Sequence, residues 1–387
     1  MKNETNNEET DDYMTNDKIA QPGIYSTRRK LNECVANNVI DKCWRCKPDW
    51  AQNRQALAQC ACGFAKGTTG GQGGEIYMVI DPSDDAENPK IGTLRYGAIQ
   101  NKPLWIVFEK DMIISLKHEL VINKDKTIDG RGVKVEIANG AGFTLPNVSN
   151  VIIHGIHMHD INQTEGGLIK ATEDQPAGMR YKSDGDGMAI FSSSKIWIDH
   201  CTLSRVVDGL IDVTLGSTAV MISNCKFSNH SKVMLLGADD GYLDDKNMQV
   251  TVAFNLFTEG CDQRMPRCRL GFFQVVNNNY DGWGSYAIGG SSAPTILSQG
   301  NKFKAPDGAN IKNVLRRADA PEAESMKWNW RTEKDVLENG AIFLASGADP
   351  TLTSEQQGCM IQAEPGESVA NLTNAAGVLT CLVGQPC

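Results

Sequence analysis

Six segments of the chain follow one template of apolar positions, in which an apolar residue is followed by a second two residues later and a third seven residues later; the last segment departs from it only by Ser298 at the second position. The segments are VIIHGIHM (151–158), IWIDHCTL (196–203), VMISNCKF (220–227), VTVAFNLF (250–257), FQVVNNNY (273–280) and ILSQGNKF (296–303). Apolar residues two apart indicate a short strand with one buried face. The pattern therefore predicts a series of similar strands, each followed by polar and glycine-rich residues.

The spacing of these segments decides among repeat architectures. Their starts, at 151, 196, 220, 250, 273 and 296, lie 45, 24, 30, 23 and 23 residues apart. The first gap fits either two turns or one turn with a long insertion. A period of this length is too short for a four-stranded propeller blade, and the LxxLxL spacing of leucine-rich repeats is absent. We therefore predict an all-β fold, a right-handed parallel β-helix.

The sixth position of each segment predicts a column of side chains along the helix axis. In chain order this position holds Ile156, Cys201, Cys225, Asn255, Asn278 and Asn301. Three asparagines in register are what an amide ladder requires, because each side chain can bond to the next. Cys201 and Cys225 would be neighbours in this column, either as a disulfide or as two stacked thiols.

The regions outside the repeats predict how the domain is completed. Residues 1–25 are acidic and are expected to be disordered, while residues 26–387 are expected to form one domain. Within it we expect an N-terminal cap (26–75), β-helix coils (76–305) and a C-terminal extension (306–387) packed on the outside. The segment after Pro48 is expected to form an amphipathic helix, with Asp49 as N-cap, whose apolar residues Trp50, Leu57 and Ala61 close one end of the solenoid.

Composition narrows the class of protein. A chain of 387 residues that is 41% hydrophobic can bury a large core, and its net charge of −9 argues against general binding to nucleic acid or anionic membranes. No apolar run is long enough to span a bilayer. The N-terminal residues contain no apolar segment typical of a signal peptide, so the chain is either cytosolic or the processed form of a secreted protein.

The twelve cysteines favour the secreted alternative. The sequences CWRC (Cys43, Cys46) and CAC (Cys60, Cys62) could form a four-thiolate zinc site, but the second spacing is unusual for zinc and we expect local disulfides instead. Glycosylation sequons begin at four asparagines and are compatible with secretion; these are Asn147, Asn162, Asn229 and Asn371.

Four aspartates recur at the spacing of the repeat. Asp184 and Asp186 are two residues apart on an extended segment, so both carboxylates can face one side. Asp208 and Asp212 follow one coil later, since Asp184 and Asp208 are 24 residues apart. A single Asp-Gly pair is commonly a turn, but four carboxylates at matched positions would repel one another unless a cation lay among them. A calcium ion is the natural occupant.

Basic residues follow along the same flank. Lys232 lies about one coil beyond Asp208, and Arg264 lies two coils further along, in a segment that also contains Arg267 and Arg269. A cation-binding patch beside a basic patch suits a polyanionic polymer whose carboxylates contact both. We expect Arg267, unlike the other two arginines, to point inward or to pair with an acid.

The histidines give a weaker indication of a functional site than the aspartates and basic residues do. His154, His157 and His159 suggest a metal site, but alternation along a strand divides them between two faces, so we expect ordinary core or surface histidines. His200 is expected to make structural hydrogen bonds at a strand end. Motifs of serine hydrolases, zinc proteases and phosphate-binding loops are absent from the sequence.

From about residue 40 to 305 the chain resembles plant pectate lyases. The resemblance rests on motifs that occur in family order and spacing; these are NPKIGTLRYG, PLWIVFEKDM, TIDGRG, SDGDGMAIF, IWIDHCTLS, DGLIDVTLGST, KVMLLG, QRMPRCR and YAIGGSSAPTILSQGN. The C-terminal segment ESMKWNWRTEKDVLENGAIF resembles the daisy-family pollen allergens of this family. One position departs from the family, which usually has a histidine where this chain has Leu270.

The resemblance implies calcium-dependent cleavage of polygalacturonate by β-elimination. It implies calcium ligands at Asp184, Asp186, Asp208 and Asp212, a catalytic residue at Arg264, and substrate binding by Lys232 and Arg269. Arg264 would act as the base at C5 of the uronate or would only stabilise the developing charge. The resemblance also implies a secreted monomer that binds pectin and, as an allergen, IgE. The alternatives are a pectin-binding wall protein without turnover and a β-helical hydrolase with paired catalytic acids.

Overall fold

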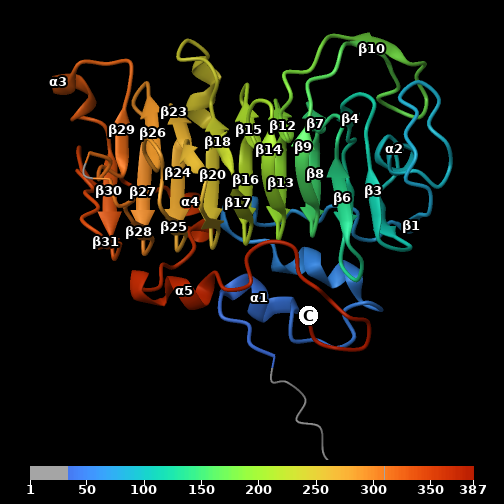
Figure 1. Cartoon of the computed structure of the whole chain (residues 1–387), viewed down its shortest axis with the longest axis horizontal. Helices are drawn as coiled ribbons and strands as arrows, with labels where there is room; N and C mark the ends of the chain where they lie inside the picture. The colour runs from blue at the N-terminus through green and yellow to red at the C-terminus, as the bar shows by residue number, and fades with distance from the viewer. Residues whose placement is uncertain (1–33, 309) are drawn as a thin grey trace, which may run out of the picture. The chain divides into compact units, whose positions relative to one another are not determined.

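Short strands from successive coils stack into three parallel sheets of ten, eight and nine strands (Figure 1). The computed structural model describes residues 34–308 and 310–387. The segment predicted to be disordered, 1–25, and the first residues of the predicted cap, 26–33, lie outside the described residues. The described part confirms the predicted parallel β-helix.

The ten-stranded sheet contains, in spatial order, β1 (Glu75–Val79), β2 (Leu104–Phe108), β5 (Lys126–Asp129), β8 (Ser149–His154), β13 (Ser194–Asp199), β16 (Thr218–Ser223), β20 (Gln249–Ala253), β24 (Phe272–Val276), β27 (Thr295–Gln299) and β30 (Trp330–Glu333). The eight-stranded sheet contains β29 (Leu315–Arg317), β26 (Ile288–Ser291), β23 (Arg267–Arg269), β19 (Met234–Leu236), β15 (Ile211–Thr214), β12 (Met188–Phe191), β7 (Phe143–Pro146) and β4 (Leu120–Val121). The nine-stranded sheet contains β3 (Met112–Ile114), β6 (Val135–Ala138), β9 (His157–Ile161), β14 (Thr202–Val206), β17 (Lys226–Ser228), β21 (Leu256–Phe257), β25 (Asn279–Asp281), β28 (Lys302–Lys304) and β31 (Val336–Glu338).

Two small sheets and several short helices complete the described chain. The small sheets pair β10 (Gly167–Ile169) with β11 (Gly178–Arg180) and β18 (His230–Lys232) with β22 (Cys261–Gln263). The α-helices are α1 (Val39–Trp44), α2 (Leu94–Ala98), α3 (Glu322–Ser325), α4 (Ser354–Cys359) and α5 (Val369–Leu372). The 3₁₀ helices are η1 (Arg54–Cys60), η2 (Gly63–Ala65), η3 (Leu243–Asn247) and η4 (Gly366–Ser368). None of the helices in this part of the chain has the length and apolar character needed to span a bilayer.

The repeat found in the sequence is the register of the ten-stranded sheet. The first residues of the six segments pair in order, from Val151 with Ile196 to Phe273 with Ile296. Because β8 pairs directly with β13, the first gap is one turn with a long insertion. That insertion carries the hairpin of β10 and β11.

The predicted amide ladder is present and fully buried. Asn255 Nδ2 donates to Asn278 Oδ1 at 3.0 Å, and Asn278 Nδ2 donates to Asn301 Oδ1 at 3.0 Å. Cys201 and Cys225 are buried free thiols in the same column, so the disulfide alternative is wrong. Each ladder amide also bonds to backbone of a neighbouring coil, and the column therefore holds the coils in register.

The solenoid extends one coil beyond the predicted boundary at residue 305. Strands β29, β30 and β31 pair with β26, β27 and β28. Asp335 occupies the ladder position of this coil and accepts hydrogen bonds from Asn301 N at 2.6 Å and Asn301 Nδ2 at 3.2 Å. The repeat analysis missed this coil because it begins at Trp330, 34 residues after Ile296 instead of 23, and has Asp335 in place of an asparagine at the ladder position.

Replacing Asp335 with asparagine is expected to raise stability at neutral pH and to change it least in acid. Burial raises the pKa of Asp335 from 3.8 to about 6. The protonated form therefore stabilises the fold fully below about pH 4, and this contribution is lost as the pH rises through the folded pKa. The difference in unfolding free energy between Asp335→Asn and the parent chain should grow by about 1–3 kcal/mol between acid and neutral pH. Urea unfolding of both chains across this range measures it, and a difference independent of pH would contradict the assignment.

The N-terminal segment covers one side of the solenoid rather than its end, so the prediction of an end-closing helix is wrong. Trp50 and Leu57 pack in one apolar cluster with Trp105, Trp197 and Met221, which point outward from the ten-stranded sheet. The segment forms the 3₁₀ helix η1, and Asp49 instead accepts a hydrogen bond from the Asn53 side chain. Because large apolar side chains on the outer face must be covered, the segment spreads along several coils (Figure 1).

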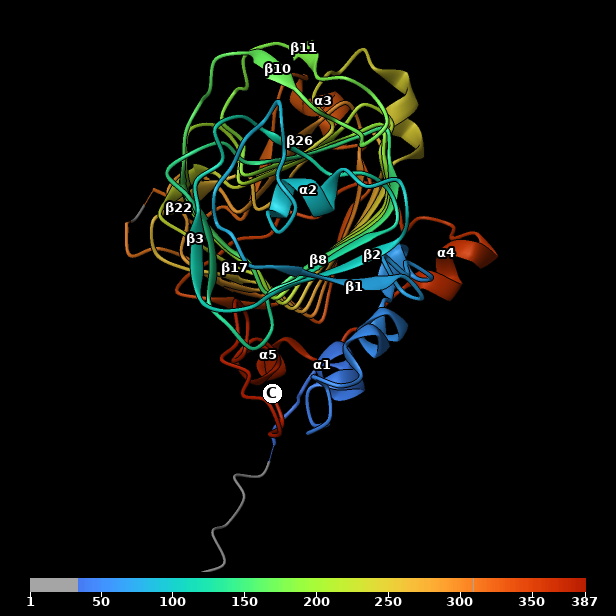
Figure 2. The same cartoon turned by 90° about the vertical axis from the view of Figure 1, so that its right-hand side faces the viewer.

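The end of the solenoid next to β1 is covered by α2. Leu94 and Ala98 of this helix belong to the main core, and Figure 2 shows the helix lying across the opening of the coils. The residues from about 352 onward pack on the outer face of the ten-stranded sheet beside the N-terminal segment. His200 joins the two covering segments, since its ring bonds to Asp41 Oδ1 at 2.9 Å and to the carbonyl of Gly377 at 3.0 Å. This confirms its structural role.

Local disulfides replace the zinc alternative. Cys34 is bonded to Cys46 and Cys43 to Cys60, which leaves Cys62 as a free thiol, and a third disulfide joins Cys381 to Cys387. Three of the four cysteines of the possible zinc site are therefore already paired.

Candidate active site

A groove of 670 Å³ lies on the outer face of the eight-stranded sheet. Its floor is a row of side chains from four successive coils, because Thr144, Ala189, Asp212 and Leu235 are in register on β7, β12, β15 and β19. Their neighbours along each strand point inward and are buried in the core. The alternation of each strand therefore places one row of side chains outside the solenoid.

Three of the predicted carboxylates converge at one end of this row. Asp184 and Asp186 precede β12 and Asp208 precedes β15, and oxygen atoms of the three lie within 4.8 Å of one another. The backbone N–H of Gly209 donates to Asp186 Oδ1 at 2.7 Å. The expectation that Asp184 and Asp186 face the same side is confirmed.

The fourth carboxylate, that of Asp212, lies next to Gly209 and close to Asp186. A Cβ atom at Gly209 would lie 2.2 Å from Asp212 Oδ1 and 3.1 Å from Asp186 Oδ1. Only a residue without a side chain fits here, so Gly209 lets the two carboxylates approach one another. Asp212 Oδ1 is covered from solvent and has no hydrogen-bond partner within the described residues.

The crowding of these acids changes their titration. Burial, followed by the charges of Asp184 and Asp208, raises the pKa of Asp186 to about 7. Burial and the charges of Asp186 and Asp208 raise the pKa of Asp212 well above its usual range. Both shifts mean that a full set of negative charges is unfavourable here without a cation.

The donor set fits a calcium ion. Calcium takes about six to eight oxygen ligands and favours carboxylates in flexible arrangements. Asp184, Asp186 and Asp208 supply oxygens within ligand-sharing distance, and the partnerless oxygen of Asp212 adds a fourth carboxylate. No histidine or cysteine of the described residues belongs to this cluster, which distinguishes it from a transition-metal site.

Lys232 borders the acidic cluster. It lies in β18, and its ammonium group donates to Asp208 Oδ1. His230, on the same strand, bonds through Nε2 to the carbonyl of Asp208 at 2.6 Å. The side chain of Lys232 is 43% exposed and that of Asp208 is 35% exposed, so both remain accessible to a ligand.

Arg264 lies one coil beyond Lys232, since Lys232 pairs with Gln263, so the expected separation of two coils is wrong. Its backbone is in the left-handed region at φ 61°, and its carbonyl accepts a hydrogen bond from Met234 at 2.7 Å. Its Nε is buried without a partner in the described structure. The guanidinium charge acts on Asp212, where it opposes the rise in pKa. An arginine with a covered and unused donor beside carboxylates is suited to a ligand that brings its own acceptor.

Arg267 and Arg269 both point outward from β23, on either side of the buried Cys268. The expectation that Arg267 points inward is therefore wrong, because an offset of two residues on a strand keeps one face. Its pairing with an acid is confirmed by a 2.9 Å bond from Nη2 to Asp319. Arg269 donates from Nε to Asp240 at 2.9 Å and from Nη1 to the carbonyl of Gly237 at 2.8 Å.

Sequence reasoning missed the wall of the groove. The β10–β11 hairpin and the residues after it bring Arg180, Tyr181 and Lys182 to the groove beside the carboxylates. Arg180 is held there by an ion pair with Glu119, and Tyr181 is 93% exposed. The only signal in the sequence was the long first gap between repeats, which marks an insertion without showing where it folds.

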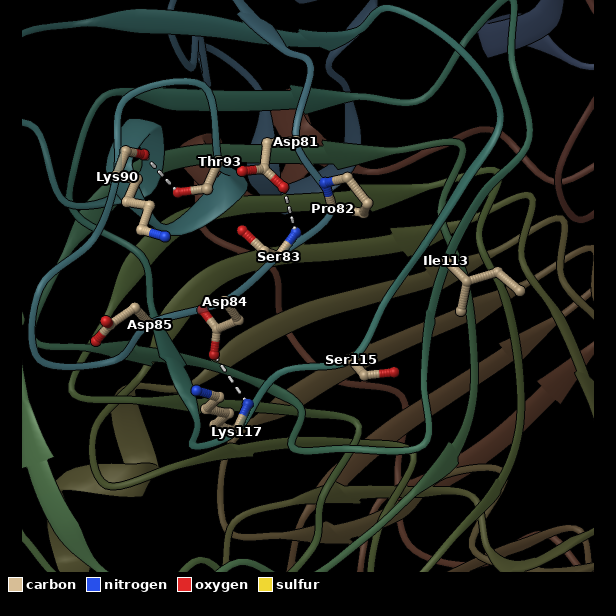
Figure 3. Close-up of a pocket in the computed structure, with 10 residues that line it drawn as sticks. All are labelled: Asp81, Pro82, Ser83, Asp84, Asp85, Lys90, Thr93, Ile113, Ser115 and Lys117. Atoms are coloured by element: carbon tan, nitrogen blue, oxygen red, sulfur yellow. Dashed lines mark hydrogen bonds between the residues drawn. The ribbon is translucent and has the colours of Figure 1, made fainter.

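A second pocket, of 530 Å³, lies near α2 at the β1 end of the solenoid (Figure 3). Its polar groups are used internally, as Figure 3 shows for the bonds of Asp81 to Ser83 and of Asp84 to Lys117. Asp84 is also bonded twice to the buried Arg95, at 2.6 and 2.9 Å. These bonds brace the loop before α2, and the predicted chemistry belongs to the groove on the eight-stranded sheet.

Comparison with known proteins bears on the same region. Residues 50–322 match the family described as pectate lyase. Pectate lyase 1 of Ambrosia artemisiifolia is 63% identical over 367 residues, which are 95% of this chain and 92% of that protein. A pectate lyase of Lilium longiflorum is 54% identical over 94% of this chain and 84% of its own length. The solved structure of the major allergen from cedar pollen has 46% identity and a TM-score of 0.87, covering 89% of this chain and 100% of that one.

Proposed function

Because the chain belongs to the pectate lyase family, as its motifs indicated, we propose that it cleaves polygalacturonate by calcium-dependent β-elimination. The observation that carries this proposal is the arrangement of charge on one outer face. A cluster of carboxylates adjoins Lys232, and Arg264 and Arg269 follow on the next coil. A linear polyuronate laid across the coils would meet both groups.

The four aspartates are proposed to hold the calcium ion. Asp184, Asp186 and Asp208 contribute the clustered oxygens, and Asp212 contributes its unpaired one. When bound, the ion supplies positive charge beside the uronate carboxylate and so favours loss of the proton on the neighbouring carbon.

Lys232 and Arg269 are proposed to bind and orient the substrate carboxylates. Both side chains now contact carboxylates of the protein, Asp208 and Asp240 respectively. A substrate carboxylate can take the place of these partners, because the pairs are partly exposed and therefore weak. The fork of Arg269 can bind a carboxylate through two parallel hydrogen bonds, whereas Lys232 acts as a point charge.

Arg264 is proposed to act at C5 of the uronate. Elimination breaks the C5–H bond and the bond from C4 to the glycosidic oxygen, forms a C4–C5 double bond, and passes one proton to a base and another to the leaving oxygen. The guanidinium stabilises the negative charge that develops as the C5 proton leaves. Arg264 would be the base itself only where neighbouring cations lower its pKa, which is ordinarily above about 12.

The same proposal includes the setting of the protein. The disulfides Cys34–Cys46, Cys43–Cys60 and Cys381–Cys387 support a secreted protein, since disulfides persist in oxidising compartments. The similarity to a pollen allergen supports a place in the pollen wall and binding by IgE. Pectin is the proposed partner, and we propose that the protein acts as a monomer.

An assay of the product tests the function. Purified protein is incubated with polygalacturonate in calcium and, separately, in a chelator, and the ultraviolet absorbance of unsaturated uronides is followed. We expect absorbance to rise only with calcium. Pectin binding without any absorbance would favour the wall-protein alternative. New reducing ends without absorbance would identify a hydrolase instead.

A further inference from the structure

A second cluster of ligand atoms lies on the outer face of the nine-stranded sheet. It consists of Glu136 on β6 and of His157 and His159 on β9, and their ligand atoms all lie within 4.8 Å of one another. Glu136 is paired in register with His157, and the rings of the two histidines are 4.5 Å apart. The inward-pointing neighbours Ile137 and Met158 are fully buried. His154 lies on β8 of the ten-stranded sheet and so apart from this face, whereas alternation along β9 places His157 and His159 on it together.

We propose that Glu136, His157 and His159 bind a divalent transition-metal ion, for which Zn²⁺ and Cu²⁺ are the probes. Two imidazole nitrogens and one carboxylate oxygen are ligands that these ions prefer. The three come from adjacent coils in a fixed register, so the site is largely formed by the stacking of strands. This site is on a different sheet from the groove and does not depend on the proposed lyase function.

The surroundings of His159 already hold it in a ligand-ready orientation. Its Nδ1 bonds to Asp160 Oδ2 at 2.7 Å, and Asp160 is fixed by two bonds of 2.8 Å from Arg205. A carboxylate on one ring nitrogen keeps the proton there and directs the other nitrogen toward a metal. That other nitrogen, Nε2, lies 2.8 Å from Glu136 Oε2. This contact needs a proton between the two atoms, and a metal ion would replace that proton.

His157 is available without breaking any other interaction. Its ring makes no hydrogen bond to another described residue. Burial, together with the charge of His159, lowers the pKa of His157 to about 4. The ring is therefore neutral at physiological pH, which is the form that coordinates a metal.

The local charge selects the kind of ion. Glu136 and Asp160 are balanced by Lys134, whose ammonium lies 2.5 Å from Glu136 Oε1, and by Arg205. A neutral frame with a single carboxylate ligand is poor for calcium, which relies on several charged oxygens. Nitrogen coordination compensates for this with zinc or copper. A bound ion would join β6 to β9 and so brace two neighbouring coils.

Titration of the metal-free chain with Zn²⁺ tests the proposal, with electron paramagnetic resonance of bound Cu²⁺ as a second readout. We expect one ion per chain at this site and a copper spectrum that shows two coupled nitrogens. His157→Ala and His159→Ala should each weaken zinc binding by at least about tenfold, and Asp160→Asn by about tenfold. Lys134→Gln should tighten it, because Glu136 Oε1 then loses its competing partner.

Two matched controls should leave the affinity unchanged: His118→Ala, which removes a histidine outside the cluster, and Asp208→Ala, which removes a carboxylate of the groove. His157→Ala is the decisive variant, since His157 has no structural bond to lose and circular dichroism should confirm an unchanged fold. Zinc binding that survives His157→Ala, or a copper spectrum without nitrogen coupling, would overturn the proposal. Failure of the lyase assay would leave it untouched.

Discussion

Substitution of Arg264 by alanine is expected to reduce the rate of elimination by about 10³-fold while the fold is retained. Loss of one preorganised donor aimed at developing charge costs about 10²–10³ in kcat, and loss of a general base costs about 10²–10⁴. The buried Nε of Arg264 has no partner among the described residues, so its removal breaks no hydrogen bond there; thermal unfolding of both chains measures the effect of losing its charge beside Asp212. Steady-state kinetics on polygalacturonate at saturating calcium measure the effect. The change should fall on kcat rather than on KM, since the interaction strengthens in the transition state.

The neighbouring arginine provides the control. Arg267 is on the same segment but is paired with Asp319, so Arg267→Ala should change kcat by only about two- to threefold. Arg264→Lys separates the two possible roles. If the guanidinium only stabilises charge, a lysine should restore part of the rate with an unchanged pH profile, whereas a lysine acting as the base should shift the profile to its own pKa. Near-full activity of Arg264→Ala would remove Arg264 from the mechanism.

The sequence predicts the stacking of the coils better than it predicts the segments that pack on the outside of the solenoid. The period of the segments, and the column from Asn255 to Asn301, follow from local alternation repeated at a constant interval. Such patterns can be recognised in the sequence because every coil packs against its neighbours in the same way and so needs similar residues at equivalent positions. The last coil escaped detection because it begins 34 residues after Ile296 instead of 23, although Asp335 continues the ladder through its side chain. A template based on apolar positions cannot recognise a carboxylate that replaces an amide.

The positions of the segments that cover the solenoid could not be predicted, because they depend on contacts between distant parts of the chain. The prediction that Trp50 and Leu57 form an apolar face was correct, but that face packs against Trp105 and Trp197 on the outside of the ten-stranded sheet. The same holds at the candidate site. The aspartates and basic residues lie on regular coils and were found by spacing, whereas Tyr181 and Asp240 lie on insertions whose folding the repeat does not determine.

Substitution of Asp186 by asparagine is expected to stabilise the calcium-free protein while weakening its use of calcium. Asn Oδ1 can still accept the bond from Gly209 N, now 2.7 Å long. The substitution removes a charge that is unfavourable beside Asp184 and Asp208, as the pKa of about 7 for Asp186 indicates. With the folded pKa raised above 3.8, the protonated form contributes stability that is lost as the pH rises through about 7. At pH values above that, the asparagine chain should be roughly 2–4 kcal/mol more stable in a chelator.

Calcium should make the parent chain gain more stability than the Asp186→Asn chain, and so offset or reverse the difference seen in chelator. An ion that binds only the folded state stabilises it in proportion to the logarithm of its concentration over Kd, and the loss of one carboxylate ligand should raise Kd by at least about tenfold. Thermal unfolding of both chains in chelator and across a calcium series measures the two effects in one experiment, and the stability curves should approach or cross as calcium rises.

Asp319→Asn is the matched control, because it removes a carboxylate from outside the cluster and should shift neither the chelator value nor the calcium midpoint. An Asp186→Asn chain that is destabilised in chelator would show that the carboxylates are not repelling one another, and an unchanged calcium midpoint would remove Asp186 from the ligand set. The opposite signs are what separate a site built for a cation from a merely structural acidic cluster, since a structural carboxylate would lose stability under both conditions.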